Sequence, residues 1–79
     1  MTSIIKPAQL SGLKQAACVM RCIVRNDNEA KIVETLGEDQ QLFDMWKLFL
    51  QHNNWITITK QGWSMTPKGA AWNKQVTTA

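Results

Sequence analysis

Apolar residues in the first third of the chain recur with the spacing of a helix. They lie alternately three and four positions apart, at Leu10, Leu13, Ala17, Met20 and Val24. This is the spacing of one helical face. Pro7 suits the first turn of such a helix, and the polar cluster at residues 25–28 would end it. We therefore predict a first helix ending near Val24, with a flexible N-terminus over residues 1–8.

Two further helices are predicted before the pattern changes. A short one over residues 29–36, capped by Asp27 or Asn28, would end at Gly37 in the left-handed conformation. Its inner face would consist of Ile32, Val33 and Leu36. A third helix, capped by Glu38 or Asp39, would run to about residue 53. Its apolar face is predicted to hold Leu42, Met45, Trp46, Phe49 and Leu50, and the polar stripe opposite to hold Gln40, Asp44, Lys47 and Gln51.

The period changes from helical to alternating after residue 54. Residues 55–59 alternate and are rich in β-branched side chains, which predicts a strand with Ile56 and Ile58 on one face. Gly62 suits the turn of a hairpin, and residues 63–66 form the return strand. Thr66 and Pro67 then read as the cap and first residue of a last short helix over residues 67–76. Residues 77–79 are expected to fray.

The predicted architecture is mainly α with a small β-hairpin (α+β). The stretch NEAKIVETLGEDQQLFDMWKLFLQHNNWI resembles the second and third helices of winged helix-turn-helix domains, and ITITKQGWSMTPKGAAW resembles their wing and exit. The resemblance covers residues 9–76 and implies one domain with three helices, a two-stranded wing and a short C-terminal helix. It also implies a transcriptional regulator that binds duplex DNA, with the third helix in the major groove and the wing along the backbone.

The resemblance assigns particular residues to the DNA-binding role. The third helix would present Gln40, Gln41, Asp44, Lys47 and Gln51, and the wing Lys60, Gln61 and Trp63, with Lys68 behind it. Because one small domain has a small footprint on DNA, a homodimer is expected. Trp63 could instead pack against the third helix, and Lys60 could be a solvated turn residue. The tryptophans Trp46, Trp55 and Trp72 are expected in the core.

The charge distribution changes this interpretation. Of the chain's nine cations, four lie in residues 1–25 and four in residues 46–79, whereas all six acids lie in residues 26–45 with Lys31. Because phosphate neutralisation by Lys and Arg supplies most DNA affinity, an acidic approach to the third helix opposes DNA binding by that helix. A DNA-binding regulator is therefore expected to contact the duplex mainly through its wing and basic terminal segments. The alternative is a protein-interaction module whose acidic segment, residues 27–44, binds a basic partner or imitates nucleic acid towards it. Its candidate residues are Glu34, Glu38, Asp39 and Asp44.

Composition and candidate chemistry exclude several other classes. The 79 residues suit one domain, and the longest apolar run has five residues, Ala16–Met20, far short of the ~20 that cross a bilayer. No signal peptide is evident, so a cytoplasmic location is expected. Cys18 and Cys22 lie one turn apart on one helical face and are expected to act as small buried hydrophobes. His52 has no local catalytic partner, so we expect no enzyme, metal, cofactor or small-molecule substrate.

Overall fold

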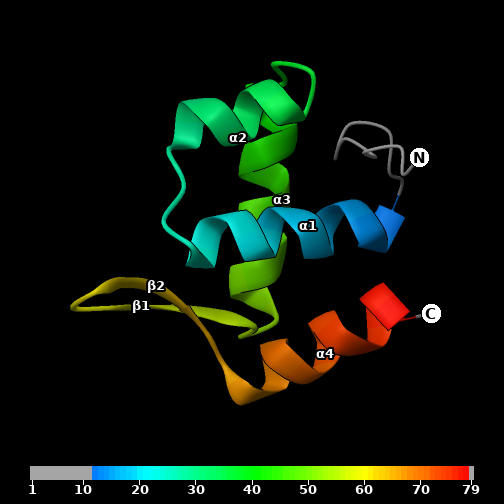
Figure 1. Ribbon diagram of the computed structural model, residues 1–79, viewed down its shortest axis with the longest axis vertical. Coiled ribbons are helices and arrows are strands. Elements are labelled where there is room, and N and C mark those ends of the chain that lie inside the picture. The colour runs from blue at the N-terminus through cyan, green and yellow to red at the C-terminus, as the bar shows by residue number, and fades with distance from the viewer. Residues whose placement is uncertain (1–11, 79) are drawn as a thin grey trace, which may run out of the picture.

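The computed structural model describes residues 12–78 and confirms the α+β architecture (Figure 1). Within that range the elements follow the predicted order, a winged-helix-like layout. They are α1 (Gly12–Val24), α2 (Glu29–Thr35), α3 (Gln40–His52), β1 (Ile56–Thr59), β2 (Gly62–Met65) and α4 (Pro67–Thr78). The expected flexible segment over residues 1–8, the start of the first helix near Pro7, and Ala79 lie outside the described residues. Helix α4 continues two residues past the predicted end, through Thr77 and Thr78.

The helix boundaries follow from local capping chemistry. Asn28 caps α2, where its side chain accepts a hydrogen bond from the Ala30 amide, and Asp39 caps α3 by accepting from the Leu42 amide. The Thr66 hydroxyl accepts from the Gly69 amide at 2.9 Å, which caps α4. Gly37 ends α2 with a φ of 77°, as the sequence predicts.

The core lies where α1 crosses α2, α3 and the base of the hairpin. The buried cluster contains Val19, Met20, Ile23, Ile32, Leu36, Phe43, Leu50 and Ile56. The buried faces of α1 and α3 are rotated relative to the apolar faces predicted for these two helices. Leu13 and Met45 were expected inside but are each 49% exposed, whereas Phe43 is 2% exposed. The reason is that α1 packs on the side of α3 that carries Phe43 and Leu50, which the spacing within α3 alone does not reveal.

An aromatic array joins α3, the start of the hairpin and α4. Trp46 contacts Phe49, and Phe49 contacts Trp55, each edge to face with ring centroids 5.5 Å apart. Trp55 stacks on Trp72 at 4.0 Å. These three tryptophans pack against the core, as predicted, and the Trp46 indole donates a hydrogen bond to Gln15 at 2.7 Å. The array therefore holds α4 to the rest of the domain.

The hairpin projects beyond the helices as a wing (Figure 1). Its antiparallel register pairs Ile56 with Met65 and Ile58 with Trp63, so all four side chains share one face. Ile56 is buried at the base of the hairpin, but Ile58 is 63% exposed because the strands extend past the core. Gly62 closes the turn with a φ of 112°, as expected.

Candidate interaction surface on the third helix and the wing

The solvent side of α3 forms one continuous surface, which we term the outer face. Phe43 and Leu50 point into the core, so the exposed residues occupy the opposite side of the helix. They are Gln40, Gln41, Asp44, Met45, Leu48, Gln51 and His52. Four of the five residues of the third helix that were predicted to contact DNA are therefore exposed together on this face. They are Gln40, Gln41, Asp44 and Gln51.

The outer face combines apolar, amide and acidic groups. Leu48 is 61% exposed and Met45 49% exposed, so two large apolar side chains stand at its centre. Asp44 carries its only carboxylate, which accepts a hydrogen bond from the Gln40 amide nitrogen at 3.1 Å. Among these seven exposed side chains there is no Lys or Arg. The surface is therefore poorly suited to phosphate and better suited to apolar contact.

Lys47 is the reading residue that does not join this surface. Its side chain is half-buried at the edge of α3 nearest the hairpin, and its ammonium lies 5.1 Å from the centre of the Trp63 ring. Trp63 is also half-buried and packs against the core. Of the two roles open for Trp63, packing against the third helix is the one this contact favours. In the structure, the Lys47 ammonium links α3 to the wing.

The remaining predicted wing contacts do not form one patch. Lys60 and Gln61 are exposed at the hairpin tip, where the Gln61 amide donates to the Thr59 hydroxyl at 3.2 Å. Lys68 is exposed in the first turn of α4, beyond the other end of β2. The four residues of β2 span roughly 13 Å, so the two lysines belong to opposite ends of the wing.

The acids assigned to a protein partner cluster at the start of α3. Glu34, near the end of α2, and Glu38 and Asp39, in the α2–α3 turn, are all exposed. Glu38 adopts a φ of 61° within this turn, and Asp39 is held as the α3 cap. Asp44 follows one turn further along α3. Glu38 and Asp39 therefore precede the N-terminal end of the outer face, Asp44 lies within that face, and Glu34 lies on the preceding helix.

Sequence reasoning missed Leu48 and misplaced Met45 in this surface. Leu48 lies seven residues after Gln41 and four after Asp44, so helical geometry puts it among the exposed polar positions. That spacing was a usable signal. Met45 carried no such signal, because its position is compatible with a broad inner face until the packing partner of α3 is known.

A hollow of about 200 Å³ lies between the wing, α3 and the α1–α2 connection. Its walls are Ile23, Asn26, Asp27, Glu29, Ile32, Phe43, Lys47 and Trp63. Because Lys47 and Trp63 contact each other across it, the hollow mainly marks the seam between the wing and the helices. Within residues 12–78 no three His, Cys, Asp or Glu side chains gather as metal ligands do.

Comparison with protein-family models, with curated proteins and with solved structures gave no match for this chain. None of the helices in residues 12–78 has the length and apolar character needed to cross a bilayer.

Proposed function

We propose that this protein is an interaction module that binds a basic protein partner through the outer face of α3. The observation that carries the proposal is the exposure of Met45 and Leu48 on a helix face that presents no Lys or Arg. Burying a large apolar side chain against a partner contributes about 1.5–3 kcal/mol. Two such side chains in the middle turns of the helix can supply the energetic core of an interface.

The chemistry of the partner follows from the border of this face. Glu38 and Asp39 precede its N-terminal end, Asp44 lies within it, and Glu34 lies on the preceding helix, so the complementary surface would carry Lys or Arg beside an apolar centre. The 13 residues of α3 are about 20 Å long, which matches a helix packed on a groove or on another helix. A nucleic-acid-binding protein is one basic partner of this kind, and the acids would then stand in for phosphates.

Duplex DNA is the second candidate, and the wing tip favours it. Lys60 and Gln61 are exposed at the end of the hairpin and could lie along a phosphate backbone. Against this, the helix that would enter the major groove offers glutamines for adenine but no cation on its outer face. Affinity would have to come from lysines at opposite ends of the wing and from the terminal segments.

One set of variants separates the two candidates. The double variant Met45→Gln/Leu48→Gln should lose the partner, whereas Leu13→Gln should retain it. Leu13 is a matched control because it is as exposed as Met45 but lies on α1. Charge reversal at Asp39 and Asp44 to Lys should also release the partner. Binding is measured by quantitative pull-down from the source cells, with thermal unfolding to verify that each variant is folded.

The DNA arm uses a labelled duplex titrated at about 50 and 200 mM salt, since phosphate contacts weaken steeply over this range. We expect no saturable binding at micromolar protein. Micromolar binding that weakens steeply with salt, and whose salt slope falls in Lys60→Ala/Lys68→Ala, would replace the protein-partner proposal by DNA binding. Retention of every partner by both the apolar and the charge-reversal variants would also overturn it.

A further inference from the structure

The solvent-facing side of α1 carries both cysteines among its cations. Lys14, Arg21 and Arg25 are exposed, and Cys18 and Cys22 between them are half-buried with free thiols. Positions 14, 18, 21 and 25 follow the four- and three-residue spacing of one helical face. Both cysteines are only half-buried, although Cys22 packs against the core, so neither is the fully buried hydrophobe that the sequence predicts.

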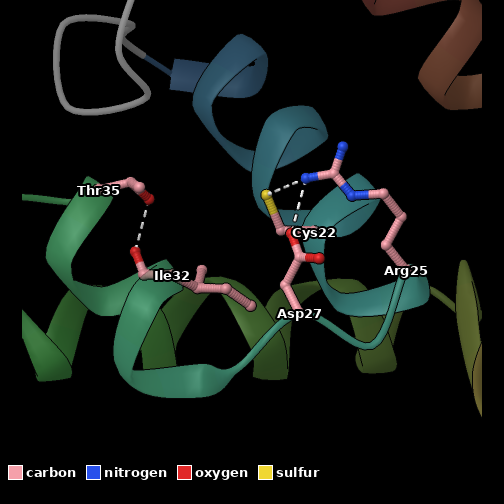
Figure 2. A network of polar contacts seen from close by, with 5 residues as sticks. All are labelled: Cys22, Arg25, Asp27, Ile32 and Thr35. Atoms are coloured by element: carbon pink, nitrogen blue, oxygen red, sulfur yellow. Dashed lines mark hydrogen bonds and ion pairs between the residues drawn. The ribbon is translucent and has the colours of Figure 1, made fainter.

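The charged contacts around the two thiols differ. The Arg25 guanidinium donates to the Cys22 sulfur at 3.7 Å. Figure 2 shows that the same guanidinium nitrogen also reaches Asp27, at 2.6 Å, in an ion pair that orients Arg25 beside Cys22. Cys18 instead lies beside Lys14 and Arg21.

This arrangement favours the thiolate form of Cys18. The neighbouring Cys22 thiol lowers the pKa of Cys18 to about 6, burial opposes this shift, and Arg21 and Arg25 lower the pKa further. The neighbouring Cys18 and burial raise the pKa of Cys22. Besides these groups, Lys14 of α1 and the uncharged Thr77 of α4 border Cys18, while Asp27 and Lys31 lie on the side of Cys22.

Cys18 opens onto a hollow suited to an anion. The hollow has a volume of about 210 Å³ and is lined by Lys14, Cys18, Arg21 and Thr77. Two cations and no acid therefore border the sulfur on this side. An electrophile that carries carboxylates could place them against Lys14 and Arg21 while its reactive atom meets Cys18.

We propose that Cys18 is a site of S-thiolation by a low-molecular-weight disulfide that bears carboxylates. The Cys18 thiolate attacks one sulfur of that disulfide, and a new sulfur–sulfur bond forms on Cys18 as the original one breaks. The other half leaves as a thiolate and takes a proton from water. The incoming disulfide is the oxidant, so no further reagent is needed. This site is independent of the proposed partner surface on α3.

The adduct should persist because Cys22 is badly placed to displace it. Displacement would join Cys18 to Cys22 within α1, and residues four apart on a helix have Cβ atoms ~5–6 Å apart. A relaxed disulfide needs a Cβ separation of about 3.5–4.5 Å. Val19 and Met20, which lie between the two cysteines, are fully packed in the core, so α1 resists the required distortion. The raised pKa of Cys22 further limits its attack.

The test exposes the full chain to oxidised glutathione, followed by alkylation, intact-mass measurement and peptide mapping. We expect a single glutathionyl group on Cys18, retained in Cys22→Ser and absent in Cys18→Ser. At pH 6, Cys18 should react with oxidised glutathione about 20-fold faster than a small-molecule reference thiol of pKa about 9. The Cys18 thiolate is more abundant but intrinsically less nucleophilic. Its rate should level off above about pH 7.

Electrostatic recognition is tested at pH 9, where Cys18 is a thiolate in every variant. Arg21→Gln should slow the reaction with oxidised glutathione several-fold but leave neutral 2-hydroxyethyl disulfide unchanged, and Lys74→Gln, on α4, should alter neither rate. Three results would overturn the proposal. These are an adduct on Cys22, a protein that loses two hydrogens without gaining an adduct, and a Cys18 rate equal to that of the reference thiol at pH 6.

Discussion

At the scale of single residues, the residue type at position 69 is set by a contact with a segment distant in sequence. Gly69 occupies the first turn of α4, is buried, and faces the backbone of Trp55 at the start of the hairpin. A Cβ at this position would overlap the Trp55 carbonyl oxygen. The TPKG stretch therefore contains a glycine because α4 must approach the chain closely enough for Trp72 to stack on Trp55.

We accordingly expect Gly69→Ala to destabilise the fold by about 3 kcal/mol, the cost of forcing α4 away from its packed position. Helix propensity alone predicts the opposite sign, a gain of about 1 kcal/mol. Thermal unfolding decides between them, with an expected fall in Tm of more than about 10 °C. Ala70→Gly, the reverse exchange at the adjacent exposed position, is the control and should cost only about 1 kcal/mol. An unchanged or raised Tm for Gly69→Ala would show that the close approach is not required.

At the scale of elements, Asp39 at the start of α3 caps the helix and, in the proposed function, also contributes charge to the partner surface. The Asp39 carboxylate accepts from the Leu42 amide at 3.0 Å and so caps the helix. The same carboxylate contributes to the acidic border of the outer face. The two functions have different chemical requirements, because capping needs a side-chain oxygen and attraction of a basic partner needs a charge.

Two substitutions at Asp39 should separate these functions. Asp39→Ala removes the cap and should cost about 1 kcal/mol, whereas Asp39→Asn keeps a capping oxygen and should cost only a few tenths. Both remove the charge, so both should weaken the partner to a similar degree. Urea unfolding measures the first effect and titration of the partner measures the second. Equal stability losses in the two variants would contradict the capping role.

At the scale of the whole molecule, α4 is joined to the domain by contacts that are distant in sequence. The buried Asn73 donates to the Ala17 carbonyl at 2.9 Å across 56 positions, and Trp72 stacks on Trp55. These contacts couple α4 to α1 and to the hairpin. A domain built this way is expected to unfold as one cooperative unit.

We therefore expect tryptophan fluorescence and far-ultraviolet circular dichroism to give coincident unfolding curves. The tryptophans lie in α3, before β1, in β2 and in α4, so their fluorescence samples most of the fold. In Asn73→Ala the two curves should remain coincident while the midpoint falls, since the lost buried hydrogen bond costs about 1–3 kcal/mol. An earlier transition in fluorescence, with most helix signal retained, would show that α4 detaches separately.

The order of elements and most of their ends could be predicted from the sequence. The change from helical to alternating periodicity located the hairpin, and the cap candidates Asp27 or Asn28, Glu38 or Asp39, and Thr66 marked the helix starts. The structure selects Asn28 and Asp39 from the two pairs. These features depend on neighbours a few residues away, where backbone propensity and capping chemistry act. For the candidate site, helical spacing placed Gln40, Asp44 and Gln51 correctly on the solvent side of α3, whereas Lys47 of the same stripe is half-buried. Gln41 was assigned by the family resemblance and is also exposed.

Only the tertiary structure decided which sides of the helices are covered and which charges are engaged. The packing of α1 on α3 buries Phe43 and exposes Met45, and the fold of the hairpin brings Trp63 to Lys47. It also leaves the two cysteines on the solvent side of α1. Periodicity alone did not determine which face of each helix is buried, because more than one face is apolar enough to pack in the core. The choice among those faces belongs to contacts between segments far apart in the chain, which local sequence does not encode.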